Sequence, residues 1–403
     1  MLVSTHCTDT HARVCTRMQV GDTKYSQILD GLTASYPSND VAHACGNSEG
    51  PGQGLSKLHS WDPALMPSWE DADLINIVTE YGATPHWVKK WDDDGPKIQS
   101  ALNDAADPPH AHHGKIVFIP FGHFHTKKTI SLSAGSRVLG AGKQSRIEMY
   151  HKLGLWSVGQ PLLVSEDIDA PVGRKYGLVL ADFHLNTHAR GQAFDLRTSK
   201  ILWKHVVTTD DGLNQFSFPP LAPKAVLSGK AGGWFYGLSP GVLNLDPIGP
   251  AAWGPTFTLL HVNGTSNPMH FYQLGIEHQT SNFQTLVENS ENVHMHAFKY
   301  ESVGIGVKQA KDEDKTKIIG GSLVRVRDST GVTMFGGSAN YTLNHPDVSR
   351  TLLDFRNTTH IELWQMVRRP EGGHEIEDGN WIQNVGPDGH SIATLSDDFD
   401  ILY

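Results

Sequence analysis

Two glutamates, Glu277 and Glu301, are the residues whose type and spacing best suit catalysis. Two carboxyl groups can hydrolyse a glycosidic bond without a cofactor, one protonated as the acid and the other ionised as base or nucleophile. The two residues are 24 positions apart. If the chain folds back on itself at about that interval, both lie on one wall, where repulsion and burial would keep one of them protonated. The alternative is a pair of solvated glutamates on a polar face.

Aromatic side chains could bind a sugar, because the C–H face of a pyranose ring is apolar. We predict substrate-binding roles for Trp234, Tyr236 and Trp253. Trp234 and Tyr236 follow the sequence GKAGG, which predicts that they lie on a loop, where binding residues concentrate. Core packing is the alternative for every aromatic residue of the chain, including the further candidates Trp203, Phe235, Phe271 and Tyr272.

Two polar residues next to the glutamates complete the predicted site. His278 follows Glu277 directly and can hydrogen-bond a sugar or hold a carboxylate. A turn histidine with satisfied hydrogen bonds is the alternative. Lys299 lies two positions before Glu301, and we predict that it binds substrate.

The chain contains 23 histidines, and two groups of them invite a metal interpretation. One is HAHH at 110–113, with His123 and His125 nearby. The other is HMH at 294–296, whose two imidazoles share one face of a strand. No Cys or carboxylate pattern of a zinc site accompanies the first group, and no P-loop, dinucleotide fingerprint or nucleophile elbow appears. We therefore expect no metal and no cofactor.

Short strands are the elements that must position these residues. Runs of β-branched and aromatic residues alternate with polar ones and stop at Gly, Asn, Asp, Pro or Ser. Similar runs return about every 30 to 40 residues, as in SENVHMH, DSTGVTM and NTTHIEL, which is typical of a solenoid coil with loop insertions. A sandwich and a propeller are the alternatives, but no blade signature appears.

One helix is predicted where the coil begins. Pro96 suits a first helical turn, Asp94 or an earlier Asp can cap it, and four apolar residues fall at helical spacing, namely Ile98, Ala101, Leu102 and Ala105. Residues 71–78 form either a short helix or a first strand. Residues 1–70 lack sustained periodicity and are predicted to be an irregular extension, followed by one β-helix domain over 71–403.

Composition limits the partners. The net charge of −10 argues against nucleic acid and anionic membranes, and no run of 18 apolar residues predicts a transmembrane helix. A polysaccharide partner is compatible with this net charge. We expect the protein to be a monomer. The first residues show no signal-peptide core, yet a polysaccharide-active protein normally needs export, so we expect an extracellular protein. One disulfide or three thiols are possible for Cys7, Cys15 and Cys45.

The sequence DDDGPKIQSALNDAA, followed by GKIVFIPFGHFHTKKTISLSAGSRVLGAG, resembles the first segment of pectate-lyase-like β-helices. In those proteins an Asp pair precedes an amphipathic helix that covers the open end of the first coil, and a strand then ends in Pro-x-Gly. The resemblance implies an all-β fold, a single right-handed parallel β-helix with an N-terminal capping helix. Many β-helix families share this segment, so it specifies the fold and not the activity.

A narrower resemblance is to the catalytic half of glycoside hydrolase family 55, the exo-acting 1,3-β-glucanases. The stretch GIEHQTSNFQTLVENSENVHMHAFKYES is similar to a family stretch with a Glu-His pair, an Asn-Val turn and a Gln-Thr-Glu motif. Glu277 and His278 match the pair, and Asn292 with Val293 matches the turn. Glu301 matches the glutamate that serves the family as general acid. The resemblance implies an inverting β-glucan hydrolase in which Glu277 orients or deprotonates the water.

The chain departs from this family in three places. GWFYGLSPGVLNLD replaces an aromatic strand near the family's sugar site, SVGIG follows the acid, and the first of the family's two β-helices has no counterpart. The departures leave two alternatives open. One is a lyase acting on uronates, with Lys299, Tyr300 or His296 as base, although no Arg cluster is visible in the sequence. The other is a non-catalytic glycan-binding β-helix.

Overall fold

The computed structural model describes residues 73–86, 92–150, 159–187, 191–209, 223–240, 258–276, 283–302, 323–341, 353–364, 366–370, 380–388, 391–396 and 401–402. The predicted N-terminal extension, residues 1–70, lies outside these ranges. Strands dominate the described residues, and their one helix is α4 (Gly95–Ala106). No helix in these ranges has the length and hydropathy to span a membrane.

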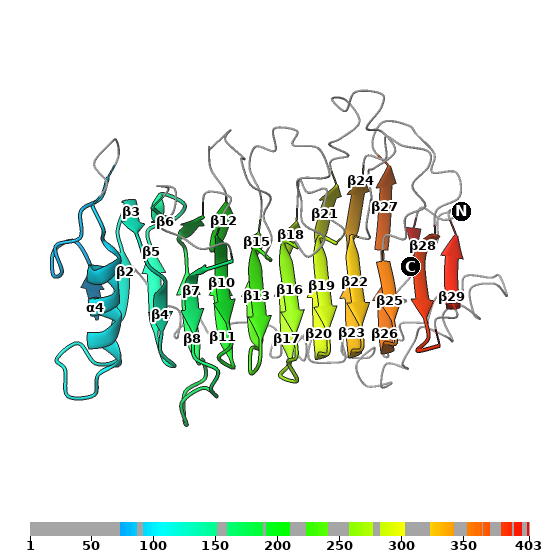
Figure 1. The fold of residues 1–403 in the computed structure, drawn as a ribbon, viewed down its shortest axis with the longest axis horizontal. Helices are drawn as coiled ribbons and strands as arrows, with labels where there is room; N and C mark the ends of the chain where they lie inside the picture. Colours follow the sequence, from blue (N-terminus) through cyan, green and yellow to red (C-terminus); the bar gives the residue numbers. More distant parts are fainter. Residues whose placement is uncertain are drawn as a thin grey trace, which may run out of the picture.

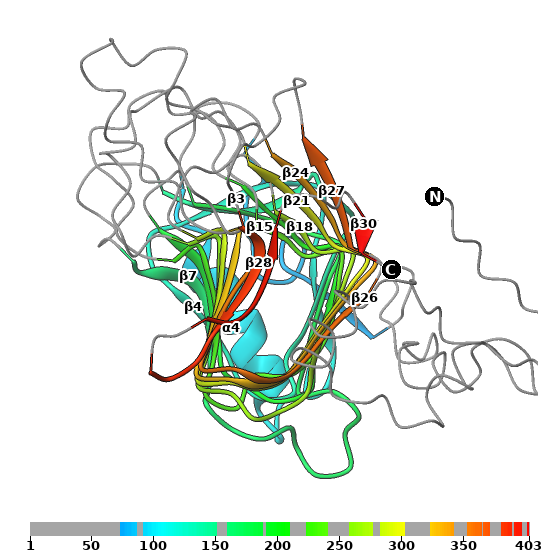
Figure 2. The ribbon, with the colours of Figure 1, turned by 90° about the vertical axis from the view of Figure 1, so that its right-hand side faces the viewer.

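The strands wind into a right-handed parallel β-helix, which confirms the predicted fold (Figure 1). Each coil contributes one strand to sheet A, one to sheet B or sheet D, and one to sheet C. Viewed along the axis, the sheets enclose a three-sided cross-section in which sheets B and D share one side (Figure 2).

Each sheet collects its strands from successive coils. Sheet A contains β1 (Leu74–Asn76), β2 (Ile116–Ile119), β5 (Arg137–Gly140), β8 (Leu178–Ala181), β11 (Ile201–Lys204), β14 (Gly233–Tyr236), β17 (Met269–Tyr272), β20 (Glu291–His296), β23 (Thr330–Phe335) and β26 (Thr359–Trp364). Sheet B contains β3 (Gly122–Thr126), β6 (Ser145–Met149), β9 (His184–Asn186), β12 (Val207–Thr209) and β15 (Ser239–Pro240). Sheet C contains β4 (Ile130–Leu132), β7 (Pro161–Ser165), β10 (Gln192–Leu196), β13 (Ala225–Ser228), β16 (Leu260–Asn263), β19 (Thr285–Glu288), β22 (Val324–Arg327), β25 (Leu353–Arg356), β28 (Asn380–Val385) and β29 (Ser391–Ser396). Sheet D contains β18 (Gly275–Ile276), β21 (Lys299–Ser302), β24 (Ser338–Tyr341), β27 (Met366–Pro370) and β30 (Ile401–Leu402).

Tight turns with left-handed backbone join the sheets. Between sheet A and sheets B or D, one turn position has positive φ in coil after coil, and its occupants include Asp182, His205, Gly237, Gln273, Ala297 and Gly336. The N–H of this residue donates to the last sheet-A residue of the next coil, as from Gln273 to the His296 carbonyl at 3.0 Å. Between sheets C and A the corresponding residues include Asn289, Asp328 and Asn357, the types that tolerate this conformation best after glycine.

The coils vary in length without losing register. Residues hydrogen-bonded one coil apart on sheet C are 27 positions apart at His261 and Glu288, but 39 apart at Glu288 and Arg327. The extra residues lie in connections between strands, because the pairing itself continues residue by residue from β16 through β19 to β22. The predicted repeat of about 30 to 40 residues therefore describes an average coil, and single coils are shorter or longer.

Large apolar side chains fill the interior of the coil. Trp203, Phe235 and Phe271 are fully buried, so the core alternative is confirmed for these three. Phe235 and Phe271 occupy the same strand position in consecutive coils and stack with ring centroids 5.0 Å apart. The indole N–H of Trp203 donates to the Val206 carbonyl at 3.2 Å, which satisfies its one polar atom.

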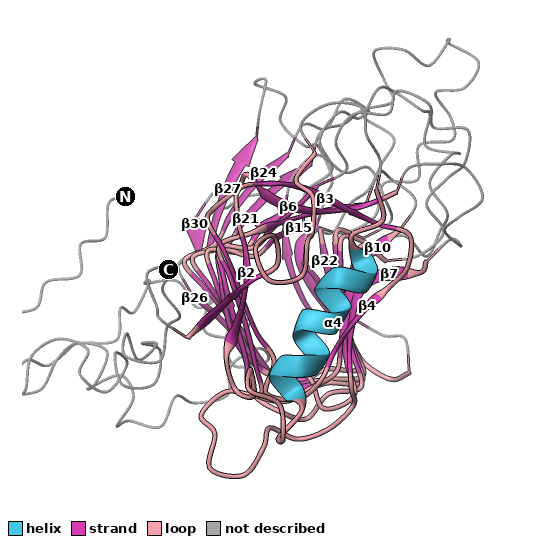
Figure 3. Ribbon diagram, turned by 90° about the vertical axis from the view of Figure 1, so that its left-hand side faces the viewer, coloured by secondary structure: helices cyan, strands magenta, loops and turns pink. Residues whose placement is uncertain are grey.

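Helix α4 closes the N-terminal end of the coil (Figure 3). Ile98, Ala101 and Leu102 are buried against the core, as their spacing predicts. The side-chain amide of Gln99 accepts from the Ser131 N–H at 2.8 Å and donates to the Ser131 carbonyl at 3.0 Å. Ser131 belongs to β4, the end strand of sheet C, so one helical side chain covers an exposed sheet edge.

The structure decides two points that the sequence left open, namely how the start of α4 is capped and whether residues 71–78 contain a helix or a strand. Asp94 occupies the N-cap position of α4 but makes no side-chain cap bond. Its buried carboxylate instead accepts from the Thr84 N–H at 3.0 Å and the Lys97 ammonium at 3.2 Å. The earlier Asp93 accepts from the N–H of Gly95, the first helical residue. Residues 74–76 form a strand, β1, and not a helix.

Truncating one stacked core ring should cost far more stability than truncating an exposed one. We expect Phe235→Ala to lower the free energy of unfolding by about 3–5 kcal/mol, because it leaves a cavity between the rings of adjacent coils. The matched control is Phe335→Ala, since Phe335 is 42% exposed, and its expected effect is within about 0.5 kcal/mol. Urea denaturation measures both, and equal losses would contradict the assignment of Phe235 to the core.

Candidate functional site

The outer face of sheet A bears ring side chains on three consecutive coils. Residues of β14, β17 and β20 alternate between core and surface, because successive side chains of a strand point to opposite faces. The outward residues form two columns in register, the first made of Trp234, His270 and His294, and the second of Tyr236, Tyr272 and His296. These six side chains are called the aromatic row below.

Rings within the row stack on one another. Tyr236 and Tyr272 have centroids 4.7 Å apart and planes 13° apart, and Tyr272 stacks on His296 at 5.0 Å and 11°. In the first column His270 stacks on His294 at 4.8 Å and 14°. The spacing follows from the fold, because neighbouring strands lie about 4.8 Å apart, close to the distance between stacked rings. Neighbouring rings cover one another's faces, and His270 Nδ1 and His296 Nε2 are buried as well. The row therefore offers a ligand mainly ring edges and the remaining polar atoms of its tips.

The tips of the row are hydrogen-bonding groups. Side chains stand roughly perpendicular to a sheet, which places phenol oxygens and imidazole nitrogens farthest from the backbone. Burial raises the pKa of Tyr236 to about 12 and also raises the pKa of Tyr272. Both phenols are protonated at neutral pH, as an unperturbed phenol also is, and the raised pKa extends this to alkaline pH. A phenol can donate as well as accept hydrogen bonds, as sugar hydroxyls require.

Apolar rings extend the row at both ends. Phe335 follows His296 in the next coil of the second column and is 42% exposed. At the other end the Tyr176 ring meets Trp234 edge to face, with centroids 5.8 Å apart and planes at 83°. The row thus lies within a longer strip that runs parallel to the coil axis, the direction in which an extended polymer could lie.

Trp234 and Tyr236, both predicted to bind substrate, lie together in this row. The prediction that they lie on a loop is wrong, because both belong to β14. The glycines before them serve the turn between sheets C and A, where Gly229 has φ +60°. Gly233 is already the first strand residue, and a side chain there would collide with the Ile201 backbone of the preceding coil.

The other predicted site residues lie on a different side of the coil or outside the described residues. Lys299 is the exposed first residue of β21 in sheet D, and Glu301 is its third. The backbone of Glu301 pairs with Asn340, and its side chain is not described. Glu277, His278 and Trp253 lie outside the described residues.

The pairing of β18, the strand that precedes Glu277, relates to the predicted catalytic pair Glu277 and Glu301. Gly275 pairs with Lys299 and Ile276 pairs with Tyr300, which sets β18 against β21 at an offset of 24 positions. Glu277 and Glu301 are separated by the same 24 positions. Only Ala297 and Phe298 separate β21 from His296, so sheet D adjoins the aromatic row at one corner of the coil.

A buried acidic residue occupies sheet B near the capping helix. Glu148 is 4% exposed, and its two oxygens lie 3.2 Å from His123 Nδ1 and 3.1 Å from His125 Nε2. Arg146 lies 3.8 Å from the same carboxylate. The described residues contain no group of three or more His, Cys, Asp or Glu placed to hold a metal ion. The Glu148 carboxylate thus lies within ion-pairing distance of Arg146 and, when they are protonated, of His123 and His125.

Carboxylates on the outer face of sheet C are also paired. Glu288 lies 2.8 Å from His261 Nε2 and accepts from Arg327 Nε at 2.5 Å. The nearly fully buried Asp354 accepts from Arg325 Nε at 2.7 Å and from Arg356 Nε at 3.1 Å. All of these pairs except Asp354 with Arg356, which lie on the same strand, join one coil to the next, and they suit cohesion of the coil better than acid–base chemistry.

Comparisons with known proteins give similarity of structure and not of sequence. No family profile and no curated protein matches the sequence. The resemblance to glycoside hydrolase family 55 therefore stays a prediction.

Solved structures with a similar backbone include proteins of phages and a bacterium. A tailspike of Acinetobacter phage vb_AbaP_AS12 has a TM-score of 0.41 and 14% identity, over 72% of this chain and 46% of its own. Gene product 12 of bacteriophage phi29 has a TM-score of 0.41 and 12% identity, over 72% and 45%. A putative glycosyl hydrolase from Parabacteroides merdae has a TM-score of 0.28 and 8% identity, over 80% and 100%. This chain spans less than half the length of the two phage proteins.

Sequence reasoning missed the histidines of the aromatic row as binding residues. The sequence invites a metal interpretation for His294 and His296, which we set aside, and it offers sugar stacking for Tyr272, but it does not single out His270. The signal is the alternation in GWFY, MHFY and VHMH, whose second and fourth residues are all rings. Seeing that these residues align needs the coil register, which differs in length from one coil to the next.

The raised pKa of Tyr236 predicts a loss of stability at alkaline pH. The unfolded phenol loses its proton near pH 10, whereas native Tyr236 keeps it to about pH 12. The native state binds more protons in this window, so the free energy of unfolding falls as pH rises through it. We expect Tyr236→Phe to give a shallower fall, measured by urea denaturation at several pH values. An unchanged slope would contradict the burial of this phenol.

Proposed function

We propose that this protein binds a polysaccharide along the outer face of sheet A and cleaves its glycosidic bonds at the adjoining sheet D side. The aromatic row is the observation on which the binding proposal depends. It sets donors and acceptors in two parallel columns, one step per coil, and a polymer with a regular series of hydroxyls complements such a surface. The apolar rings of Phe335 and Trp234 suit the C–H faces of sugars near the ends of the row.

Glu301 and Glu277 are the proposed catalytic pair. Support comes from the 24-position offset between β18 and β21, which equals their separation in sequence. Glu301 would protonate the leaving oxygen, and Glu277 would deprotonate the attacking water, as in an inverting hydrolase. A β-glucan is the proposed substrate from the family resemblance, and action outside the cell accompanies it. His278 and Trp253 are proposed to contact the sugar, as is Lys299 at the start of β21.

Binding should depend on the polar tips of the row. Tyr272→Phe keeps the ring stacked between Tyr236 and His296 but removes the O–H, and we expect about 10-fold weaker polysaccharide binding. Tyr81→Phe is the matched control, because Tyr81 hydrogen-bonds Asp104 beside the capping helix, away from the row. Affinity electrophoresis in gels containing laminarin measures both. Equal retention by wild type and Tyr272→Phe would reject the row as the binding surface.

Cleavage should depend on Glu301. We expect glucose release from laminarin by the wild-type protein and its loss, by about 100-fold or more, in Glu301→Gln, because an amide cannot supply the proton. Glu291→Gln is the matched control, since Glu291 is exposed at the start of the neighbouring strand β20. Full activity of Glu301→Gln would reject the assignment. Unsaturated uronate absorbance from polyuronates would indicate a lyase, and binding without product would indicate a non-catalytic protein.

A further inference from the structure

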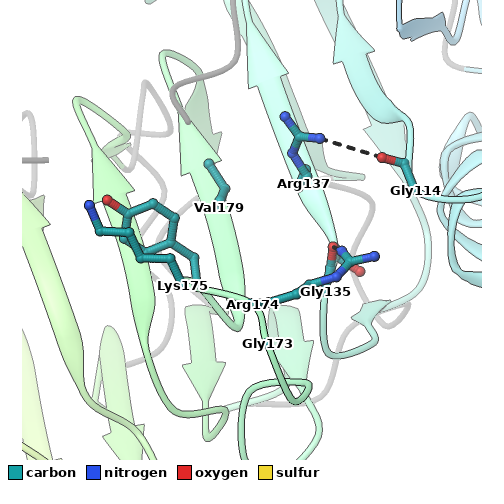
Figure 4. Close-up of a pocket in the computed structure, with 9 residues that line it drawn as sticks. Gly114, Gly135, Arg137, Gly173, Arg174, Lys175 and Val179 are labelled. Carbon is teal, nitrogen blue, oxygen red and sulfur yellow. Dashed lines mark hydrogen bonds between the residues drawn. The ribbon is translucent and has the colours of Figure 1, made fainter. Parts of the chain in front are cut away.

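A basic depression opens on sheet A at the N-terminal end of the strip that contains the aromatic row (Figure 4). It has a volume of about 520 Å³ and lies between β5 and the segment that leads into β8. Its charged lining residues are Arg137, Arg174 and Lys175. None of the described residues that line it is acidic, although the chain as a whole has a net charge of −10.

The coil register aligns this depression with the aromatic row. Arg137 of β5 pairs with Val179 of β8, and Val179 pairs with Leu202 of β11. Leu202 in turn pairs with Trp234, the first residue of the first column of the row. One outward column of sheet A therefore runs from a guanidinium across two aliphatic side chains to the indole and imidazole rings.

Ring contacts join the two parts directly. The Lys175 ammonium lies 5.3 Å from the centroid of the Tyr176 ring, within the range of a cation–π interaction. The same Tyr176 ring packs edge to face on Trp234. Tyr176 thus lines the depression and also packs on Trp234, and it belongs to the cluster that buries Val179 and Leu202 between the two parts. A ligand that reaches both parts would pass over this cluster.

Backbone carbonyls orient the two guanidinium groups. Arg137 donates to the Gly114 carbonyl at 3.4 Å, and Arg174 donates to the Gly135 carbonyl at 3.3 Å. Gly135 has φ +91°, and a side chain there would come within 3.1 Å of the Arg174 guanidinium. A guanidinium has five N–H donors in a planar fork, so one bond to a carbonyl leaves Arg174 able to bind an oxyanion through its other donors.

We infer that the depression binds the anionic substituent, a sulfate ester or a carboxylate, of a polysaccharide whose neighbouring sugars lie on the aromatic row. The inference rests on the proposed glycan-binding function and changes its preferred ligand from the neutral β-glucan of the family resemblance to a glycan with anionic substituents. Three cationic side chains line the depression, and charge-assisted bonds from Arg and Lys to an oxyanion are stronger than neutral hydrogen bonds. A nucleic acid would instead need basic residues spread along its phosphates, against a net charge of −10.

Matched polysaccharides test the inference. Binding of the full chain to a sulfated galactan, to polygalacturonate and to neutral laminarin is measured by calorimetry at low and at moderate salt. We expect one anionic polymer to bind at least about 10-fold more tightly than laminarin at low salt, with the advantage reduced by added salt. Preference for the sulfated polymer or for the polyuronate identifies which oxyanion the depression takes.

Two double variants distinguish binding at the depression from nonspecific attraction between the protein's positive charges and an anionic polymer. The double variant Arg174→Gln with Lys175→Gln should weaken anionic-polymer binding about 10-fold or more and leave laminarin binding unchanged. Both residues are exposed, so the fold should tolerate the change. The control double variant is Lys128→Gln with Lys143→Gln, which removes two exposed charges outside the depression. An equal loss in the control, or no loss in the first variant, would overturn the inference.

The experiments distinguish rejection of the basic depression from rejection of the proposed glycan-binding function. If Tyr272→Phe weakens binding but the Arg174 and Lys175 variant retains full anionic binding, the row stands and the depression is rejected. If the wild-type chain binds no glycan, inorganic sulfate still tests the depression, because it should raise the melting temperature of the wild type more than that of the variant, beyond the stabilisation that sulfate gives any folded protein. Equal shifts for both proteins would reject an oxyanion site.

Discussion

Backbone hydrogen bonding between successive coils is the constraint on which this structure depends. Each strand pairs in parallel with its counterpart one coil later, and β14, β17 and β20 continue the pairing without a shift. Because side chains alternate across a strand, this unbroken pairing keeps inward residues inward in every coil. The same pairing stacks Phe235 on Phe271 inside and Tyr236 on Tyr272 outside, so one ladder creates both the core and the proposed binding surface.

The turns are what allow that ladder to continue. A change of direction within one or two residues requires left-handed backbone, and the chain supplies it with Asp, Asn, His or Gly at equivalent positions such as Asp182, His205 and Gly237. Longer connections are inserted elsewhere, so coil length changes without a change of register. The ends need separate solutions: α4 covers the first coil, and at the last coil β29 and β30 pair antiparallel with β28 and β27.

A column that runs along the coil axis is an efficient way to recognise a polymer. Each coil advances by about one strand spacing, so residues far apart in sequence line up on one face of the coil. Arg137 and His294 belong to one such column of sheet A although they lie in well-separated parts of the chain. Charge at one end and hydrogen-bonding rings beyond it give the strip a direction, which would fix the orientation of an anionic glycan. Sheet C contrasts with this face, because its outer carboxylates Glu288 and Asp354 are paired with cations.

The sequence alone determined the elements that depend on local patterns. Alternating strands, Asn and Asp turns such as Asn289 and Asn357, and the apolar spacing of Ile98, Ala101 and Leu102 predicted a solenoid of short strands and one amphipathic helix, since each depends on neighbouring residues. The resemblance to pectate-lyase-like proteins added the right-handed β-helix and the capping role of that helix. The sequence also identified Trp234 and Tyr236 as binding candidates, but it placed them on a loop and did not align them with Tyr272 and His296. Only the tertiary structure brought Arg137 to Arg174 and set both in line with Trp234, because coil lengths vary and strand pairing, not sequence distance, decides which residues meet. The Arg cluster that the sequence does not reveal is therefore a product of the coil register.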